Sequence, residues 1–153
     1  MNDQRGSSVV DLVIVLTILG ILASIAIPTV VDASAGAATR GARDSFVTAH
    51  GLARASAIRR SRPAELHIDA ASARFWVEVD TSAFGTSKMD TVGVITDLSD
   101  HTVTITSDAD LLCFDARGIA LIEGSCAAGA TIVFQRRGES HSVQVTSLGK
   151  VLR

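Results

Sequence analysis

The chain has 153 residues and a formal net charge of −2, and 47% of its residues are hydrophobic. Charged residues make up 20%, which together with that apolar content excludes an intrinsically disordered chain. The acidic balance and the 4% content of aromatic residues argue against a nucleic-acid-binding protein, which usually carries a basic surface. The length leaves room for one small core, so a multidomain enzyme is also excluded.

A block of 20 uncharged residues, Leu12–Val31, separates Asp11 from Asp32, and 15 of the 20 are apolar. As an α-helix the block would be about 30 Å long, which matches the hydrocarbon core of a bilayer. About 43% of the remaining residues are apolar, as in a modest water-soluble domain. We therefore expect one membrane-spanning helix, kinked near Pro28 because the proline ring displaces a main-chain carbonyl.

Three interpretations of this block compete. It could be an uncleaved membrane anchor, or a secretory signal cleaved at Ala33-Ser34-Ala35. Against the signal, the leading segment Met1–Gly6 has no basic excess and the apolar core is longer than a signal needs. The third interpretation starts from Asp11, because a carboxylate at the edge of a membrane helix is costly without a partner. If the chain were cut after Gly6, the new amine of Ser7 on one subunit could neutralise Asp11 of its neighbour in a helical stack.

That arrangement resembles the signature of the type IV prepilins, in which a short leader ends in glycine. The fifth mature residue of that family is acidic and residue 22 is proline, and Asp11 and Pro28 stand at these positions counted from Ser7. The chain departs from the pattern with Ser7 in place of Phe or Met and with Asp11 in place of Glu. The resemblance implies cleavage by a prepilin peptidase between Gly6 and Ser7 and methylation of the Ser7 amine. It also implies that Asp11 and Pro28 serve subunit assembly and register.

The helical pattern continues beyond the apolar block through Asp32–Arg62, which is rich in alanine and arginine. The spacing predicts one helix from Ser7 to about Ser61, ended by Pro63 because the residue before a proline leaves helical geometry. Three glycines within Asp32–Arg62 weaken this part of the helix and favour local kinks: Gly36, Gly41 and Gly51. A narrow apolar stripe at three- and four-residue spacing predicts close packing on one face, and its members are Phe46, Ala49, Ala53 and Ala57.

From Ala64 onward the hydrophobic period changes to two, which is typical of strands. Leu66 and Ile68 predict one strand, Phe75–Asp80 predicts the next, and Ala70–Ala73 is the expected hairpin between them. Glycines that can take positive φ mark two later turns, at Asp115–Gly118 and Arg136–Ser140. We expect a loop with short strands over Phe84–Asp100. Further strands are expected at Thr102–Thr106, Leu111–Phe114, Ile119–Ile122, Thr131–Gln135 and His141–Thr146.

Three segments of this region resemble the GspH/FimT branch of the pilin-like proteins. The stretch Ala42–Ile68 resembles the helix end of that branch and the strand that follows it. The segment Cys113–Gly118 resembles its strand and glycine turn, and Leu148–Val151 resembles its closing glycine, basic and hydrophobic residues. The residues of the helix end that match are Leu52, Ala53, Arg54, Ala57, Ile58, Arg59, Arg62 and Pro63.

The resemblance implies a pilin-like α+β fold, with a long N-terminal helix packed on an antiparallel β-sheet or β-sandwich head. The implied parts are a leader (1–6), an assembly helix (7–31), its periplasmic continuation (32–62) and a β-rich head (63–153). It further implies a non-enzymatic minor pseudopilin or pilin in the bacterial inner membrane, with its head in the periplasm. Implied partners are other pilin subunits, prepilin peptidase, the inner-membrane assembly platform, membrane lipid and secreted cargo. The alternatives are a minor pilin that binds DNA and an anchored periplasmic domain that does not polymerise.

Two cysteines, Cys113 and Cys126, have 12 residues and one predicted turn between them. In an oxidising periplasm we expect them to pair, and closing such a loop stabilises a domain by about 3 kcal/mol. The alternative is a pair of reduced, buried thiols.

A group of basic residues would form one patch if the helix end met the C-terminal strands. Such a patch suits DNA phosphates, but the net charge and the few aromatic side chains favour a solubilising or subunit-pairing surface. The candidates for DNA or partner contact are Arg136, Arg137, Lys150 and Arg153, beside Arg59, Arg60 and Arg62.

The four histidines are scattered along the chain, and none belongs to a known catalytic or metal-binding motif. We therefore expect no catalytic residues, no metal site and no cofactor. These histidines are His50, His67, His101 and His141.

Overall fold

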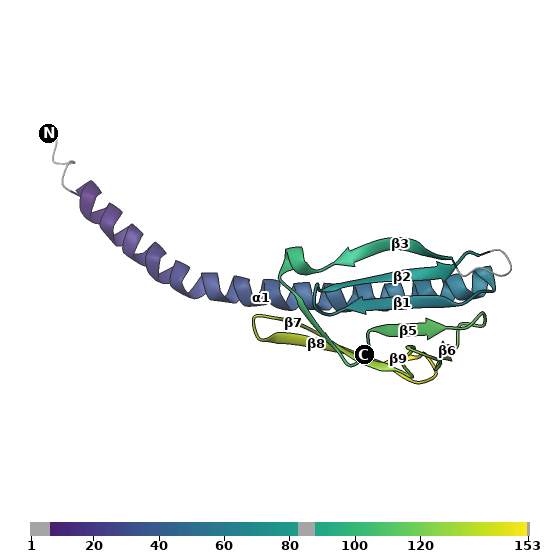
Figure 1. Cartoon of the computed structure of the whole chain (residues 1–153). Helices are drawn as coiled ribbons and strands as arrows, with labels where there is room; N and C mark the ends of the chain where they lie inside the picture. Colours follow the sequence, from purple (N-terminus) through teal and green to yellow (C-terminus); the bar gives the residue numbers. More distant parts are fainter. Residues whose placement is uncertain (1–6, 83–87, 153) are drawn as a thin grey trace. The chain divides into compact units, whose positions relative to one another are not determined.

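The computed structural model describes residues 7–82 and 88–152, which form two compact units that divide between Ala35 and Gly36. A single long helix, α1 (Ser7–Arg60), precedes a series of short strands (Figure 1). The strands and one 3-10 helix are β1 (Ala64–Asp69), β2 (Arg74–Asp80), β3 (Met89–Asp97), η1 (Ser99–His101), β4 (Thr104–Ser107), β5 (Leu111–Phe114), β6 (Ala120–Leu121), β7 (Ala130–Arg136), β8 (Glu139–Val145) and β9 (Val151–Leu152). The predicted α+β architecture, a long N-terminal helix followed by antiparallel sheets, is confirmed.

The end of α1 lies where the sequence predicts it. Ser61 adopts a left-handed conformation with φ of 52°, and its N–H bonds to the carbonyl of Ile58. The next N–H, of Arg62, reaches back to the carbonyl of Ala57 at 3.1 Å. This pair of bonds is the Schellman motif, which satisfies the last helical carbonyls before Pro63 redirects the chain.

The strands form two antiparallel sheets, with orders β3-β2-β1-β5-β6 and β4-β7-β8-β9. The hairpin between β1 and β2 is closed by Asp69, whose carboxylate accepts the N–H groups of Ala71 and Ser72 at 3.1 Å. The turn between β7 and β8 is tighter than expected. Only Arg137 and Gly138 lie outside the strands, with φ values of 50° and 88°, as a two-residue type I′ turn requires.

The loop with short strands expected over Phe84–Asp100 differs from the structure, in which Met89–Asp97 form one nine-residue strand, β3. Residues 84–87 of that range lie outside the described residues. This strand is the edge of its sheet and shows no alternation of buried and exposed residues. Val92 pairs with Val77 and Thr96 pairs with Phe75, so three residues of β3 lie opposite Trp76 alone. The resulting bulge breaks the two-residue period on which the prediction relied. The short strand β9 was also not predicted, and β4 begins two residues later than expected.

The core of the unit that begins at Gly36 lies between α1 and the two sheets. Phe46 is fully buried, and its ring lies 5.5 Å from that of Phe75 and 5.9 Å from that of Phe134. Ala53 and Ala57 on the same helix face are also fully buried, whereas Ala49 is partly buried. The predicted stripe is therefore confirmed, with His50 as an additional member that the sequence analysis left out.

His50 is a buried imidazole at the centre of this helix face. It is 3% exposed, and its ring meets the ring of Phe114 edge-on at 5.1 Å. Its Nε2 atom has no hydrogen-bond partner within residues 7–82 and 88–152. Burial, with a smaller contribution from the nearby charge of Arg54, lowers the pKa of His50 from 6.5 to about 4. The folded protein therefore holds His50 neutral over a pH range in which the unfolded chain binds a proton.

This difference makes stability depend on pH in a defined window. As the pH falls from 6.5 towards 4, the unfolded chain gains a proton that the folded head does not take up, so the free energy of unfolding decreases. The loss is about 3 kcal/mol over the window, at about 1.4 kcal/mol per pH unit. Urea unfolding of the full chain in detergent at pH 7, 5.5 and 4.5 measures it. His50→Gln should flatten the dependence and His101→Gln, at an exposed site, should not; equal slopes in both variants would contradict the assignment.

Candidate functional site

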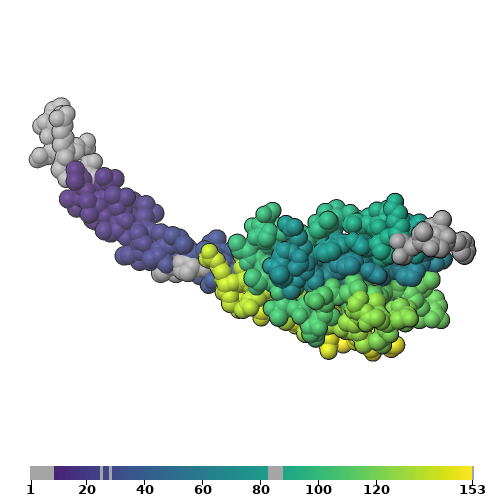
Figure 2. Space-filling view, in the orientation of Figure 1, coloured from purple at the N-terminus to yellow at the C-terminus, as the bar shows by residue number. Residues whose placement is uncertain are grey.

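The N-terminal unit presents an apolar helix surface without a polar face. Its described large apolar side chains, from Val9 to Val30, are 50–67% exposed, and the purple segment of Figure 2 shows them at the surface. By length and composition this helix could cross a membrane. A continuous apolar surface of this size is not stable in water, so it marks contact with lipid or with other protein chains.

The hydroxyl groups on this segment are satisfied within the helix. Thr17 donates to the carbonyl of Ile14 at 2.8 Å, and Ser24 and Thr29 make the same type of bond to the residues three positions earlier. Asp11 differs from them, because it is exposed and the structure gives it no ion pair within the described residues. Asp11 is therefore a charge on an apolar helix that needs a partner from outside.

The other residues of the predicted processing site are placed only in part. Ser7 is the first described residue and lies in α1, and Gly6, on the other side of the predicted cleavage point, lies outside the described residues. Pro28 lies within the helix. α1 continues through Pro28 and through Gly36, Gly41 and Gly51.

Arg54 joins the three segments that carry the family resemblance. Its Nε donates to the carbonyl of Gly118 at 2.8 Å, and its Nη1 donates to the carbonyl of Gly149 at 3.3 Å. Both glycines have positive φ, 74° and 75°, which frees these carbonyls from strand pairing at the turns. The helix end, the turn after β5 and the turn before β9 therefore meet at one guanidinium, a role that sequence matching alone did not assign.

Cys113 and Cys126 form a disulfide with a Cα–Cα distance of 5.5 Å. Cys113 lies in β5, and Cys126 lies in the segment between β6 and β7. The segment is also held by a bond from the Ala127 N–H to the Leu111 carbonyl at 3.0 Å. The disulfide fixes this loop beside β6, which is the edge strand of its sheet.

The predicted basic residues of the β7–β8 turn do not lie beside Lys150. Arg137 lies in the β7–β8 turn and Lys150 lies just before β9, with the seven residues of β8 between the two turns. At about 3.3 Å per strand residue this places them roughly 20 Å apart. Arg136 is bonded to Thr102 at 3.1 Å, and Arg62 pairs with Asp80 at 3.6 Å. Arg153 lies outside the described residues.

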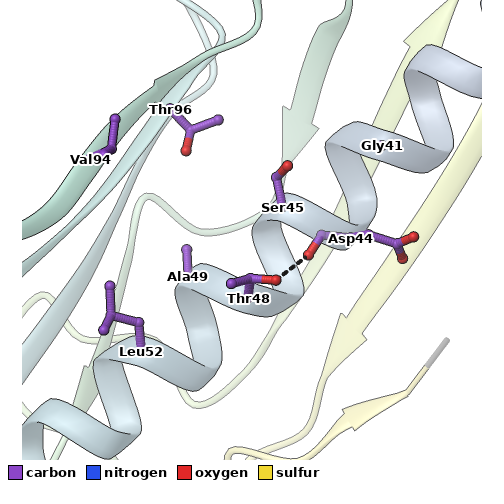
Figure 3. Close-up of a pocket in the computed structure, with 8 residues that line it drawn as sticks. All are labelled: Gly41, Asp44, Ser45, Thr48, Ala49, Leu52, Val94 and Thr96. Carbon is purple, nitrogen blue, oxygen red and sulfur yellow. Dashed lines mark hydrogen bonds between the residues drawn. The ribbon is translucent and has the colours of Figure 1, made fainter.

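A cleft of about 400 Å³ lies between α1 and β3 in the head (Figure 3). Its helix side includes Ser45 and Leu52, and its strand side includes Val94 and Thr96. Of the lining residues, Asp44 alone is ionisable, and it forms an ion pair with Arg43 at 3.2 Å. The lining therefore offers a shallow, mixed surface without a pair of groups that could exchange a proton with a substrate.

Comparisons with known proteins assign the head to one family. Residues 42–149 match the family model for the type II transport protein GspH. The fold resembles the type IV minor pilin FimU of Pseudomonas aeruginosa, at 14% identity and a TM-score of 0.56, over 74% of this chain and 86% of that one. It also resembles the minor pseudopilin EpsH from the type 2 secretion system of Vibrio cholerae, at 17% identity and a TM-score of 0.56, over 74% and 94%. No curated protein sequence matches the chain.

Arg54 should contribute more to the free energy of unfolding than the other arginines at the helix end. Arg54→Met keeps most of the aliphatic stem but removes two charge-assisted bonds, so we expect a loss of about 2 kcal/mol in the free energy of unfolding. Arg59→Met changes an exposed side chain and should stay within about 0.5 kcal/mol of the parent. Chemical denaturation of the two full-length variants in detergent gives the comparison. Similar losses in both would show that the Arg54 bonds do not hold the turns.

Proposed function

We propose a function from the premise that the chain belongs to the GspH family of type II transport proteins. In this proposal the chain is a minor subunit of a type II secretion pseudopilus or of a type IV pilus. Its apolar helix packs into the core of a filament. The observation that carries this proposal is the exposed apolar helix of the unit that ends at Ala35, with Asp11 at the edge of its apolar block, in a chain whose second unit is a folded head.

The energetics of the helix support assembly over a free soluble state. Each large aliphatic side chain gains about 1.5–3 kcal/mol on leaving water, and the described stretch from Val9 to Val30 exposes all of its large ones. Lipid satisfies this requirement before assembly. A subunit can leave the bilayer only if the apolar helices of neighbouring subunits replace the lipid contacts.

Asp11 supplies the specificity that apolar contacts lack. Cleavage between Gly6 and Ser7 would create a positive amine at the first residue of α1, four positions before Asp11. In a staggered stack of subunits that amine would neutralise Asp11 of the neighbour, and in a medium of low dielectric constant such a pair is strong. A neighbour in another register would leave both charges unpaired, so the pair would select one stagger.

The same premise gives a location and a set of partners. The chain would be anchored in the inner membrane by the apolar part of α1, with its head in the periplasm, where the Cys113–Cys126 bond is stable. Prepilin peptidase would cleave it and its Ser7 amine would be methylated. Other pilin subunits, the assembly platform and secreted cargo would be its protein partners.

Neither enzymatic activity nor DNA binding is part of the proposal. The cleft beside α1 and β3 supplies no combination of groups for catalysis among its lining residues. The length of β8 separates Arg136 and Arg137 from Lys150, so these candidates do not combine into one surface for DNA phosphates.

Substitution of Asp11 tests the proposed role directly. Asp11→Ala removes an exposed charge from an apolar helix, so membrane insertion should be unchanged or improved. Incorporation into the filament should fall at least about tenfold. Without Asp11, the positive amine of a neighbouring Ser7 would be buried without a partner, which costs several kcal/mol. The measurement is the fraction of the chain recovered in sheared filaments relative to the membrane fraction, with the other subunits co-expressed.

Two matched variants complete this experiment. Asp32→Ala removes the carboxylate at the other edge of the apolar block and should assemble normally. Asp11→Glu keeps the charge and should retain assembly. If Asp11→Ala entered filaments as well as the parent chain, the chain would instead behave as an anchored domain for which Asp11 sets no register.

A further inference from the structure

The outer face of the β1–β2 hairpin carries two carboxylates directly opposite each other. The register pairs Glu65 of β1 with Glu78 of β2 and, two residues on, His67 with Trp76. Alternate residues of both strands, such as Leu66 and Val77, are buried in the core, so this group of four lies on the opposite face. Like charges directly across a strand pair are destabilising. The pairing of Glu65 with Glu78 therefore requires a positive group between them.

The imidazole of His67 points its Nε2 atom at both carboxylates. Nε2 lies 3.2 Å from Glu65 Oε2 and 3.5 Å from Glu78 Oε2. This nitrogen is shielded from solvent and has no hydrogen-bond partner in the part of the chain that the structure describes. A histidine nitrogen that faces two carboxylate oxygens at these distances offers the same set of donor atoms as a metal site.

The neighbouring side chains hold these three groups in place. The ring of His67 stacks on that of Trp76, with centroids 5.0 Å apart and planes 3° from parallel. The indole N–H of Trp76 donates to Glu78 Oε1 at 2.8 Å, which turns the other oxygen of Glu78 toward His67. On the far side of Glu65, the register places Cys113 and its disulfide. Such outer contacts are what orients the ligands in protein metal sites.

We propose that Glu65, His67 and Glu78 bind a divalent transition-metal ion, with Zn²⁺ as the best match. Ligands about 2.0–2.2 Å from a tetrahedral Zn²⁺ are about 3.3–3.5 Å from one another, and the two distances from His67 Nε2 are 3.2 and 3.5 Å. All three donor atoms lie within 4.8 Å of one another. A nitrogen ligand favours zinc over Ca²⁺ or Mg²⁺, which prefer oxygen donors alone.

The ion would cross-link β1 to β2 and cancel the repulsion between their carboxylates. The side chains of Glu65, His67 and Glu78 are 30%, 26% and 25% exposed, so the site opens on one side to solvent. A water molecule, or a donor group from another subunit, would complete the coordination there. The site thus lies on the surface of the head and is independent of the apolar helix.

Trp76 makes this proposal easy to test, because it is the single tryptophan of the chain and it stacks on the proposed ligand. The full chain in detergent is stripped with EDTA and titrated at pH 7.5 with Co²⁺, which occupies zinc sites and quenches indole fluorescence. We expect saturable quenching with one ion per chain, reversed by Zn²⁺ and not by Ca²⁺. Glu65→Gln and Glu78→Gln should each weaken Co²⁺ binding at least about tenfold, by analogy with the effect of lost supporting contacts. Asp100→Asn, at an exposed carboxylate elsewhere, should leave binding unchanged.

A second measurement does not depend on the variants. Zn²⁺ should raise the Tm of the parent chain more at pH 7.5 than at pH 5.5, because the metal requires an unprotonated imidazole. Quenching that does not saturate, equal affinities in the parent and both Gln variants, or a Zn²⁺ effect on Tm that is the same at both pH values would overturn the proposal. A proton on His67 would then be the group that offsets the two carboxylates.

Discussion

The fold of the head depends on one contact, the ring of Phe46 between two sheets. Phe46 lies on α1 and is fully buried, and it reaches Phe75 on β2 and Phe134 on β7 at the same time. Those two strands belong to different sheets, so neither sheet can bury its inner face without this helix. Ala53 and Ala57 allow the close approach because their side chains end at Cβ. Arg54, one position from Ala53, then fixes the turns that close the structure.

The two parts of α1 suit different surroundings. In the head it buries a narrow stripe of small residues and Phe46, which is the pattern of a helix packed on sheets. In the N-terminal unit it exposes large aliphatic side chains on every side, which suits lipid or the core of a helical assembly. Asp11 and Arg54 show the same division. Asp11 bears a charge without a described ion-pair partner, whereas Arg54 bonds to two carbonyls of its own chain.

Local sequence patterns were sufficient for most elements of the fold. Pro63 marked the end of the helix, and the alternation around Leu66 and Ile68 predicted the first strand. β3 was missed because its bulge opposite Trp76 and its place at the edge of the sheet destroy the alternating pattern. A period can be read from a sequence only where each residue has one neighbour across the strand.

Sites that depend on register or on distant contacts were beyond local patterns. Nothing near His50 in the sequence shows that Phe114 covers it. Arg137 and Lys150 were grouped as possible members of one patch although a strand was expected between them at His141–Thr146, and β8 does separate them. The cluster of Glu65, His67 and Glu78 arises only when the hairpin register places 65 opposite 78. We expected no metal site because the histidines are scattered along the chain, and one histidine with two cross-strand carboxylates leaves no spacing signature.

If the apolar helix belongs to a processed, assembling subunit, the mature chain begins at a defined residue, which its N-terminus reveals. Mass spectrometry of the protein extracted from membranes of cells that contain the prepilin peptidase should give a chain that begins at Ser7 and is heavier by one methyl group. A chain that still begins at Met1 would contradict processing and point to an uncleaved anchor. A chain that begins at Gly36 would show that the helix is a secretory signal and would refute the account of Asp11.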